Sequence, residues 1–188
     1  SGRTKDTNSN FIAKKLLQEG IKLQEVIIIK DDKKTIIDKV IYYSKKCSYV
    51  FTTGGIGPTH DDITSQSISE AFNLKYQINE EAFKILEKYY QPSEFNEGRQ
   101  RMTWMPSNAK LILNPSSGAP GFYVENVFCL PGVPSILESM LPSINNKLVG
   151  GDPILSLTIS LRTLESEISK PLKEVQNKNI DVDIGSYP

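Results

Sequence analysis

Several features that define whole classes of protein are missing from this sequence. Only two of its 188 residues are cysteines, and Cys47 and Cys129 lie far apart without a CxxC motif. This usage gives no sign of a disulfide framework and fits reduced thiols in a cytoplasmic protein, but it leaves a pairing between the two open. No apolar run approaches the roughly 20 residues that cross a bilayer, and no signal peptide is visible.

An excess of charge of either sign is also missing. The chain has 22 basic and 22 acidic residues, so its formal net charge is zero. No global field therefore attracts nucleic acid or an anionic membrane, and we expect neither as a partner. An anion site, if present, must be built locally.

One expected strand is missing as well. A helix is predicted over 8–19, with Asp6 or Thr7 as its cap and Gly20 as its stop. A parallel sheet needs a strand before that helix, and the chain begins after it. Since the other end also stops directly after an apolar alternation, we expect a fragment of a longer chain.

The order of the remaining elements predicts an α/β fold. The apolar run in 23–29 indicates a strand buried on both faces, and Tyr49–Thr53 a second buried strand. A helix capped by Asp31 or Asp32 separates them, and a helix over about 65–72 follows, with Thr64 as its candidate cap. Alternating helices and strands are typical of a mostly parallel sheet in a three-layer α/β/α sandwich.

The second half of the chain shows weaker patterns. Gly150–Pro153 is the best linker candidate, so we expect one domain over 1–150 and a partial small α+β domain over 151–188. The elements predicted here are a helix capped by Asn79 and closed by Pro92, a helix over 93–103, a hairpin over Tyr123–Leu130, a helix from Pro134 to about Asn145, a strand over 154–161, a helix over 165–177 and a strand over 180–184.

A glycine-rich loop between strand and helix is the main candidate site. Gly54, Gly55 and Gly57 follow the buried strand at its carboxyl end, where open α/β sheets bind ligands. Glycines let an anion approach the backbone amides, and the next helix directs its N–H groups to the same place. The chain has neither a P-loop GK[ST] nor a GxGxxG motif, so a tight turn without a ligand fits the glycines equally well.

Acidic residues beside the loop favour ligand binding. Asp61 and Asp62 would repel a phosphate unless a divalent cation stood between them, and Mg²⁺ usually binds one or two carboxylates plus substrate phosphates. We therefore predict both as catalytic residues and metal ligands, Asp62 first. Charge at the start of a helix is the simpler alternative for Asp62. Asp6 could approach the same cleft or act only as a cap, while Arg99 and Arg101 could clamp a phosphate or lie on an exposed helix.

The ordered motifs TTGGIGPTHDDIT, GRTKDTN, NPSSGAPGF and LPGVP resemble the molybdopterin-binding (MoCF biosynthesis) superfamily. Within it, residues 1–150 look most like the amino-terminal domain of the competence/damage-inducible CinA family. The resemblance implies a phosphate-binding pocket. Its residues, matched by position, are Asp6, Asn8, Gly54, Gly55, Gly57, Asp61, Asp62, Thr64, Ser117, Gly118, Pro131 and Gly132.

The resemblance also implies several activities. CinA-type domains are linked to cleavage of ADP-ribose that depends on a divalent metal (Mg, Mn or Co), and a similar domain of some FAD synthases hydrolyses FAD. The alternatives are molybdopterin binding with adenylyl transfer, as in MoaB and MogA proteins, and a non-catalytic ligand-binding module. Relatives form dimers or trimers, so we expect a homo-oligomer. Two departures matter: the family's Gly-Asp-Glu element is absent, and Gln66 stands where many relatives carry Glu.

Overall fold

Four strands form the central sheet in the computed structural model, which describes residues 5–153 and 155–186. Their order across the sheet is β1 (Val50–Thr53), β6 (Val127–Leu130), β5 (Gly121–Val124) and β4 (Lys110–Ile112). β1 runs parallel to β6, whereas the other two pairings are antiparallel. A separate antiparallel pair joins β2 (Tyr76–Ile78) to β3 (Trp104–Pro106). The sheet is therefore mixed.

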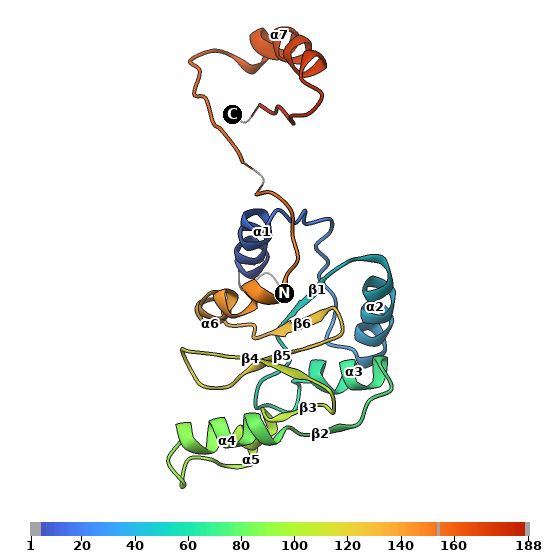
Figure 1. The fold of residues 1–188 in the computed structure, drawn as a ribbon, viewed down its shortest axis with the longest axis vertical. Helices are drawn as coiled ribbons and strands as arrows, with labels where there is room; N and C mark the ends of the chain where they lie inside the picture. Colours follow the sequence, from blue (N-terminus) through green and yellow to red (C-terminus); the bar gives the residue numbers. More distant parts are fainter. Residues whose placement is uncertain (1–4, 154, 187–188) are drawn as a thin grey trace. The chain divides into compact units, whose positions relative to one another are not determined.

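Helices cover both faces of this sheet, as Figure 1 shows. α1 (Asn8–Gln18), α6 (Pro134–Met140) and the 3₁₀ helix η1 (Leu141–Lys147) pack on the face that carries Phe128 and Leu130. α2 (Lys33–Lys46) and α3 (Thr64–Ala71) pack on the opposite face, against Val127 and Cys129. Since successive residues of a strand point to opposite faces, β6 is buried along its whole length. The predicted α/β/α class is confirmed.

Local signals place most helix ends where the sequence predicts them. The Asp32 carboxylate accepts a hydrogen bond from the Thr35 N–H at 2.8 Å, which caps α2. The Asn79 side chain caps α4 (Glu80–Tyr89) in the same way. Gly20 ends α1 with a positive φ of 66°, a conformation that glycine adopts without steric cost. These three predictions are confirmed.

The hairpin between β5 and β6 also forms as predicted, and it positions β1. Its turn consists of Glu125, with φ at 51°, and Asn126. The Asn126 side-chain amide donates to the carbonyls of Ser44 and Cys47, which lie at the end of α2. The Asn126 carbonyl accepts from the Val50 N–H at 2.9 Å. One turn residue thus holds the start of β1 beside β6.

The buried strand predicted over 23–29 is wrong. This segment forms neither helix nor strand and is exposed, with Ile28 88% accessible. Its backbone makes no backbone hydrogen bond to any described residue. Its Glu25 carboxylate lies 3.7 Å from Lys46, at the end of α2. An apolar run becomes a strand only when a neighbouring strand supplies a ladder. β1 likewise pairs on one edge only within the described residues.

Three helix predictions are corrected in detail. Only Glu97–Arg101 (α5) is helical within 93–103, because the Asn96 side chain caps a helix that starts there by accepting from the Arg99 N–H. The helix from Pro134 changes to the tighter η1 at Leu141. Thr64 is not a cap: Ile63 holds that position, and it makes no side-chain hydrogen bond.

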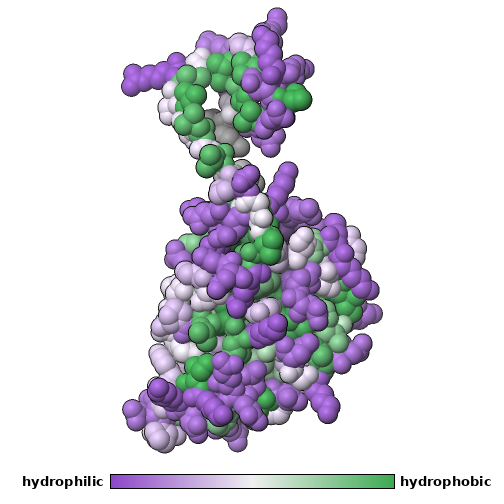
Figure 2. All heavy atoms as spheres, in the orientation of Figure 1, coloured by the Kyte–Doolittle hydropathy of each residue, from purple (hydrophilic) through white to green (hydrophobic). Residues whose placement is uncertain are grey.

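The chain divides into two units, Ser1–Ile154 and Leu155–Pro188. In the second unit, α7 (Glu165–Lys178) confirms the helix predicted over 165–177. The strands predicted over 154–161 and 180–184 are wrong for the part of each that the structure describes, which excludes Ile154. Figure 2 shows hydrophobic surface on this unit, and Leu155, Leu157 and Ile159 are largely exposed. None of the helices within 5–153 or 155–186 is long and apolar enough to cross a membrane.

Candidate functional site

The glycine loop leaves the sheet at the end of β1 and returns to the start of α3. The Gly54 N–H donates to the Leu130 carbonyl at 2.9 Å, which extends the parallel ladder by one bond. Gly54 and Gly55 then take positive φ values of 91° and 70°, which side chains disfavour. The Thr64 N–H donates to the Gly55 carbonyl at 2.9 Å, and the Thr64 hydroxyl occupies the space that a Cβ at Gly55 would need.

Three consecutive backbone N–H groups of this loop have no acceptor among the described residues. They belong to Gly55, Ile56 and Gly57, which are half-buried. Unpaired N–H groups after residues of positive φ form anion-binding concavities, and the nearby N-terminus of α3 adds positive potential. Two of the three predicted phosphate-binding glycines, Gly55 and Gly57, therefore present donors that an anion requires, whereas the N–H of Gly54 is used by the sheet.

Asp62 is held at the edge of this loop by Thr59. Its Oδ2 accepts from the Thr59 N–H at 2.9 Å and from the Thr59 hydroxyl at 2.7 Å. The same oxygen leaves no room for a side chain at Gly57, where a Cβ would lie 2.7 Å from it. These contacts fix the carboxylate beside the unpaired N–H groups. Its Oδ1 makes no hydrogen bond within the described residues and is the atom left for a ligand.

Asp61 is exposed but stays ionised at neutral pH. The nearby polar side chain of Thr59 lowers the pKa of Asp61 below 3.8, and the positive charges of His60 and Arg101 lower it further. Arg101 thus lies within electrostatic range of the loop. Arg99 is engaged elsewhere, since its guanidinium stacks 4.0 Å from the Tyr90 ring centroid and donates to the Glu94 carbonyl at 2.7 Å.

The predicted metal ligands do not form a preassembled cluster. No three His, Cys, Asp or Glu side chains within 5–153 or 155–186 come together in a way that would hold a metal ion. The Asp6 carboxylate accepts from the Ser9 N–H and hydroxyl, at 3.1 and 2.6 Å, and so caps α1. A cation at Asp62 would therefore take most of its ligands from substrate phosphates and water, which is usual for Mg²⁺.

Asn8, near the start of the chain, also lies at this site. Its side-chain amide donates to the Gly132 carbonyl at 2.9 Å, and Gly132 packs against Gly54, where a Cβ built on Gly132 would lie 3.3 Å from the Gly54 Cα. The start of α1, the glycine loop and the loop after β6 therefore meet at the carboxyl ends of β1 and β6. Pro131 precedes Gly132 in the last of these loops.

The remaining predicted residues, Ser117 and Gly118, make other contacts. Asn114 closes their turn by accepting from the Ser117 N–H and donating to its hydroxyl. Gly118 has a φ of 76° and packs on the Tyr89 ring. None of their described contacts reaches the glycine loop.

Sequence reasoning did not identify the role of Thr59, or the unpaired hydroxyls of two other threonines. Thr59 orients Asp62, while the Thr7 and Thr52 hydroxyls are buried without a hydrogen-bond partner in the described structure. Thr52 lies opposite Cys129, a free thiol whose pKa burial raises to about 12. A threonine in a strand or beside a helix cap looks structural in a sequence, so only the fold reveals these hydroxyls.

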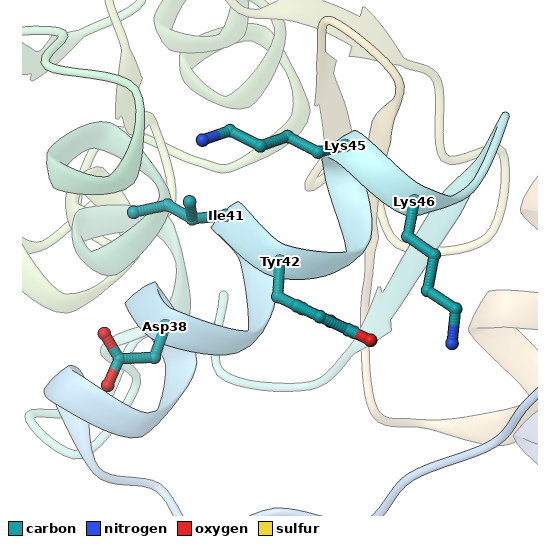
Figure 3. Close-up of a pocket in the computed structure, with 5 residues that line it drawn as sticks. All are labelled: Asp38, Ile41, Tyr42, Lys45 and Lys46. Carbon is teal, nitrogen blue, oxygen red and sulfur yellow. The ribbon is translucent and has the colours of Figure 1, made fainter.

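A hollow on the surface of α2 does not belong to this site. Asp38, Ile41, Tyr42, Lys45 and Lys46 line it, all from one helix, and their side chains fan outward instead of converging (Figure 3). It contains none of the predicted site residues.

Known proteins are similar to this chain in sequence and in fold. Residues 1–150 match the family model described as "Probable molybdopterin binding domain", and residues 153–188 match "FAD synthase, middle domain". The chain is similar to a protein of Archaeoglobus fulgidus, with 36% identity over 188 residues that cover all of this chain and 80% of the relative. A CinA-like protein of Geotalea uraniireducens is 34% identical over 74% of this chain, but this covers only 35% of the bacterial protein.

A solved structure supports the same assignment. The CinA protein of Thermoplasma acidophilum, whose function is described as unknown, superposes with a TM-score of 0.72 at 29% identity, covering 78% of this chain and 89% of that one. The chain belongs to the molybdopterin-binding (MoCF biosynthesis) domain family and is similar within it to CinA-type amino-terminal domains.

Proposed function

We propose that this domain binds a phosphate-bearing nucleotide at the glycine loop and hydrolyses its pyrophosphate bond with the help of a divalent metal. ADP-ribose and FAD-like dinucleotides are the substrate class. The observation that carries the proposal is the row of unpaired N–H groups from Gly55 to Gly57 beside the fixed carboxylate of Asp62. Phosphoryl chemistry needs donors for the phosphate oxygens and a carboxylate that can bind a divalent cation beside them.

Each residue of the site has a distinct part in this proposal. The three N–H groups bind phosphate oxygens and stabilise the charge that develops on them. Asp62 would hold the cation, while Thr59 keeps the carboxylate oriented through Oδ2. A bound divalent cation would neutralise phosphate charge and lower the pKa of water. The water oxygen then attacks one phosphorus, the bridging P–O bond breaks, and the water proton passes to solvent.

The decisive experiment measures AMP release from ADP-ribose and FAD with Mg²⁺, Mn²⁺ or Co²⁺. We expect turnover by the unmodified protein and a loss of about 10²-fold or more in Asp62→Asn, which removes the charge but keeps the shape. Asp38→Asn on the exposed side of α2 is the matched control and should leave turnover unchanged. No turnover with any metal, or full activity in Asp62→Asn, would overturn the proposal.

Two alternatives have observations in their favour. The description of the matched family favours molybdopterin binding with adenylyl transfer. The lack of a preassembled metal cluster in the described residues favours a binding module without turnover. Molybdopterin binding at micromolar concentrations, without dinucleotide binding, would select the first alternative. Dinucleotide binding without AMP release would select the second.

A further inference from the structure

Asn8 carries a buried hydrogen-bond acceptor that the protein leaves unused. The residue is only 9% exposed and lies at the first position of α1. Its Nδ2 is occupied by the Gly132 carbonyl at 2.9 Å, whereas its Oδ1 has no partner within the described residues. Buried polar side-chain atoms are paired in the large majority of cases, so an orphan of this kind needs an explanation.

The orientation of the amide is fixed by its partner. A backbone carbonyl can only accept a hydrogen bond, so the group that faces Gly132 must be the NH₂ of Asn8 and not its oxygen. The exchange of O and N that is often ambiguous in side-chain amides is therefore excluded. The atom that remains free is an acceptor, and a phosphate oxygen cannot satisfy it.

The position of Asn8 places this acceptor beside the glycine loop. Gly132 lies between the two, bonded to Asn8 and packed against Gly54. The Thr7 hydroxyl, from the residue before Asn8, is also buried and unpaired within the described residues. The carboxyl end of the sheet therefore has N–H donors in the glycine loop and buried polar oxygens at Asn8 and Thr7.

We propose that Asn8 is a specificity residue, which accepts a hydrogen bond from an O–H or N–H group on the non-phosphate part of the ligand. The inference rests on the proposed function, because it concerns the ligand of the same site. It narrows that ligand to a molecule that carries both an anion and a donor, such as the hydroxyls of a ribose. Inorganic pyrophosphate satisfies the loop but leaves Asn8 Oδ1 unpaired.

The test compares the affinities of ADP-ribose and inorganic pyrophosphate by titration calorimetry. We expect Asn8→Ala to lower the preference for ADP-ribose over pyrophosphate about tenfold, the size of one lost hydrogen bond to a buried acceptor. Asn8→Asp keeps an oxygen in the place of Oδ1 but loses the bond to the Gly132 carbonyl, so it separates the two contacts. It should keep the preference for ADP-ribose over pyrophosphate, while its charge weakens the binding of both anions. An unchanged affinity for pyrophosphate shows that the alanine variant is folded.

Asn114 is the matched control. It is as buried as Asn8, at 8% exposure, but all of its polar atoms are paired, with Ser116, Ser117 and Ala119. Asn114→Ala should lower the melting temperature and leave the preference unchanged. If the unmodified protein binds neither ligand, both the proposed function and the proposed role of Asn8 are overturned. If it binds pyrophosphate and Asn8→Ala leaves the preference unchanged, only the role of Asn8 is overturned.

Discussion

Two apolar extended stretches of this chain, Val127–Leu130 and residues 155–161, have opposite environments. The first is β6, paired on both edges and covered by helices on both faces, so all four of its side chains are buried. The second alternates apolar and polar residues in the manner of a strand, yet it has no ladder in the described structure and Leu157 is 87% exposed. An apolar sequence pattern makes a stretch suitable for a sheet, but the stretch becomes a strand only when a neighbouring strand pairs with it.

The largest expected effect on stability comes from replacing one leucine in each stretch by alanine. Leu130→Ala removes a fully buried side chain and should lower the free energy of unfolding of the first unit by about 2–5 kcal/mol. Leu157→Ala is the same chemical change at an exposed position and should cost less than about 0.5 kcal/mol. Urea unfolding measures both. An equal cost for the two would mean that residues 155–161 bury their apolar face in solution.

Helix starts give a second, smaller contrast. Asn79 caps α4, whereas α7 starts after Leu164 without a side-chain cap. Asn79→Ala should cost about 1 kcal/mol of stability. Leu164→Ser would place a hydroxyl three residues before Glu167, which completes a capping box and should stabilise α7 by a similar amount. Circular dichroism during unfolding reports both changes. A loss of helix in Leu164→Ser would show that Leu164 contributes packing that the structure does not describe.

The sequence predicts the parts of this fold that depend on neighbouring residues. Asp32, Asn79 and Gly20 act within one helical turn, so their roles follow from local chemistry. The segment 23–29 fails as a strand because its fate depends on a partner that the described residues do not supply. The same reason explains the failure of the strand over 155–161.

The residues of the candidate site likewise differ in how far apart they lie in the sequence. Gly54, Gly55 and Asp62 lie within one short loop, and their proximity is readable from the sequence. The contact between Asn8 and Gly132 joins residues 124 positions apart and requires the complete sheet edge. Resemblance to a family pointed to both residues, but only the structure shows which atom of Asn8 is left free.

The smallest expected effect is the loss of stability at low pH from the start of α1. Unlike the start of α7, it has a carboxylate, that of Asp6, bonded to its first turn. Hydrogen bonds from the Ser9 hydroxyl and N–H lower the pKa of Asp6 below 3.8. A carboxyl group whose pKa is lowered by folding stabilises the fold above its unfolded pKa, and this contribution disappears as the pH falls through the lowered value. Because Asp6 is exposed, the change in stability is slight.

The pKa of Asp6 itself is the better measurement. An NMR titration should place it below 3.8 and find it closer to 3.8 in Ser9→Ala, which removes the hydroxyl but keeps the N–H. An unchanged pKa in that variant would mean that the backbone alone holds the carboxylate, and the cap of α1 would then depend on one bond instead of two.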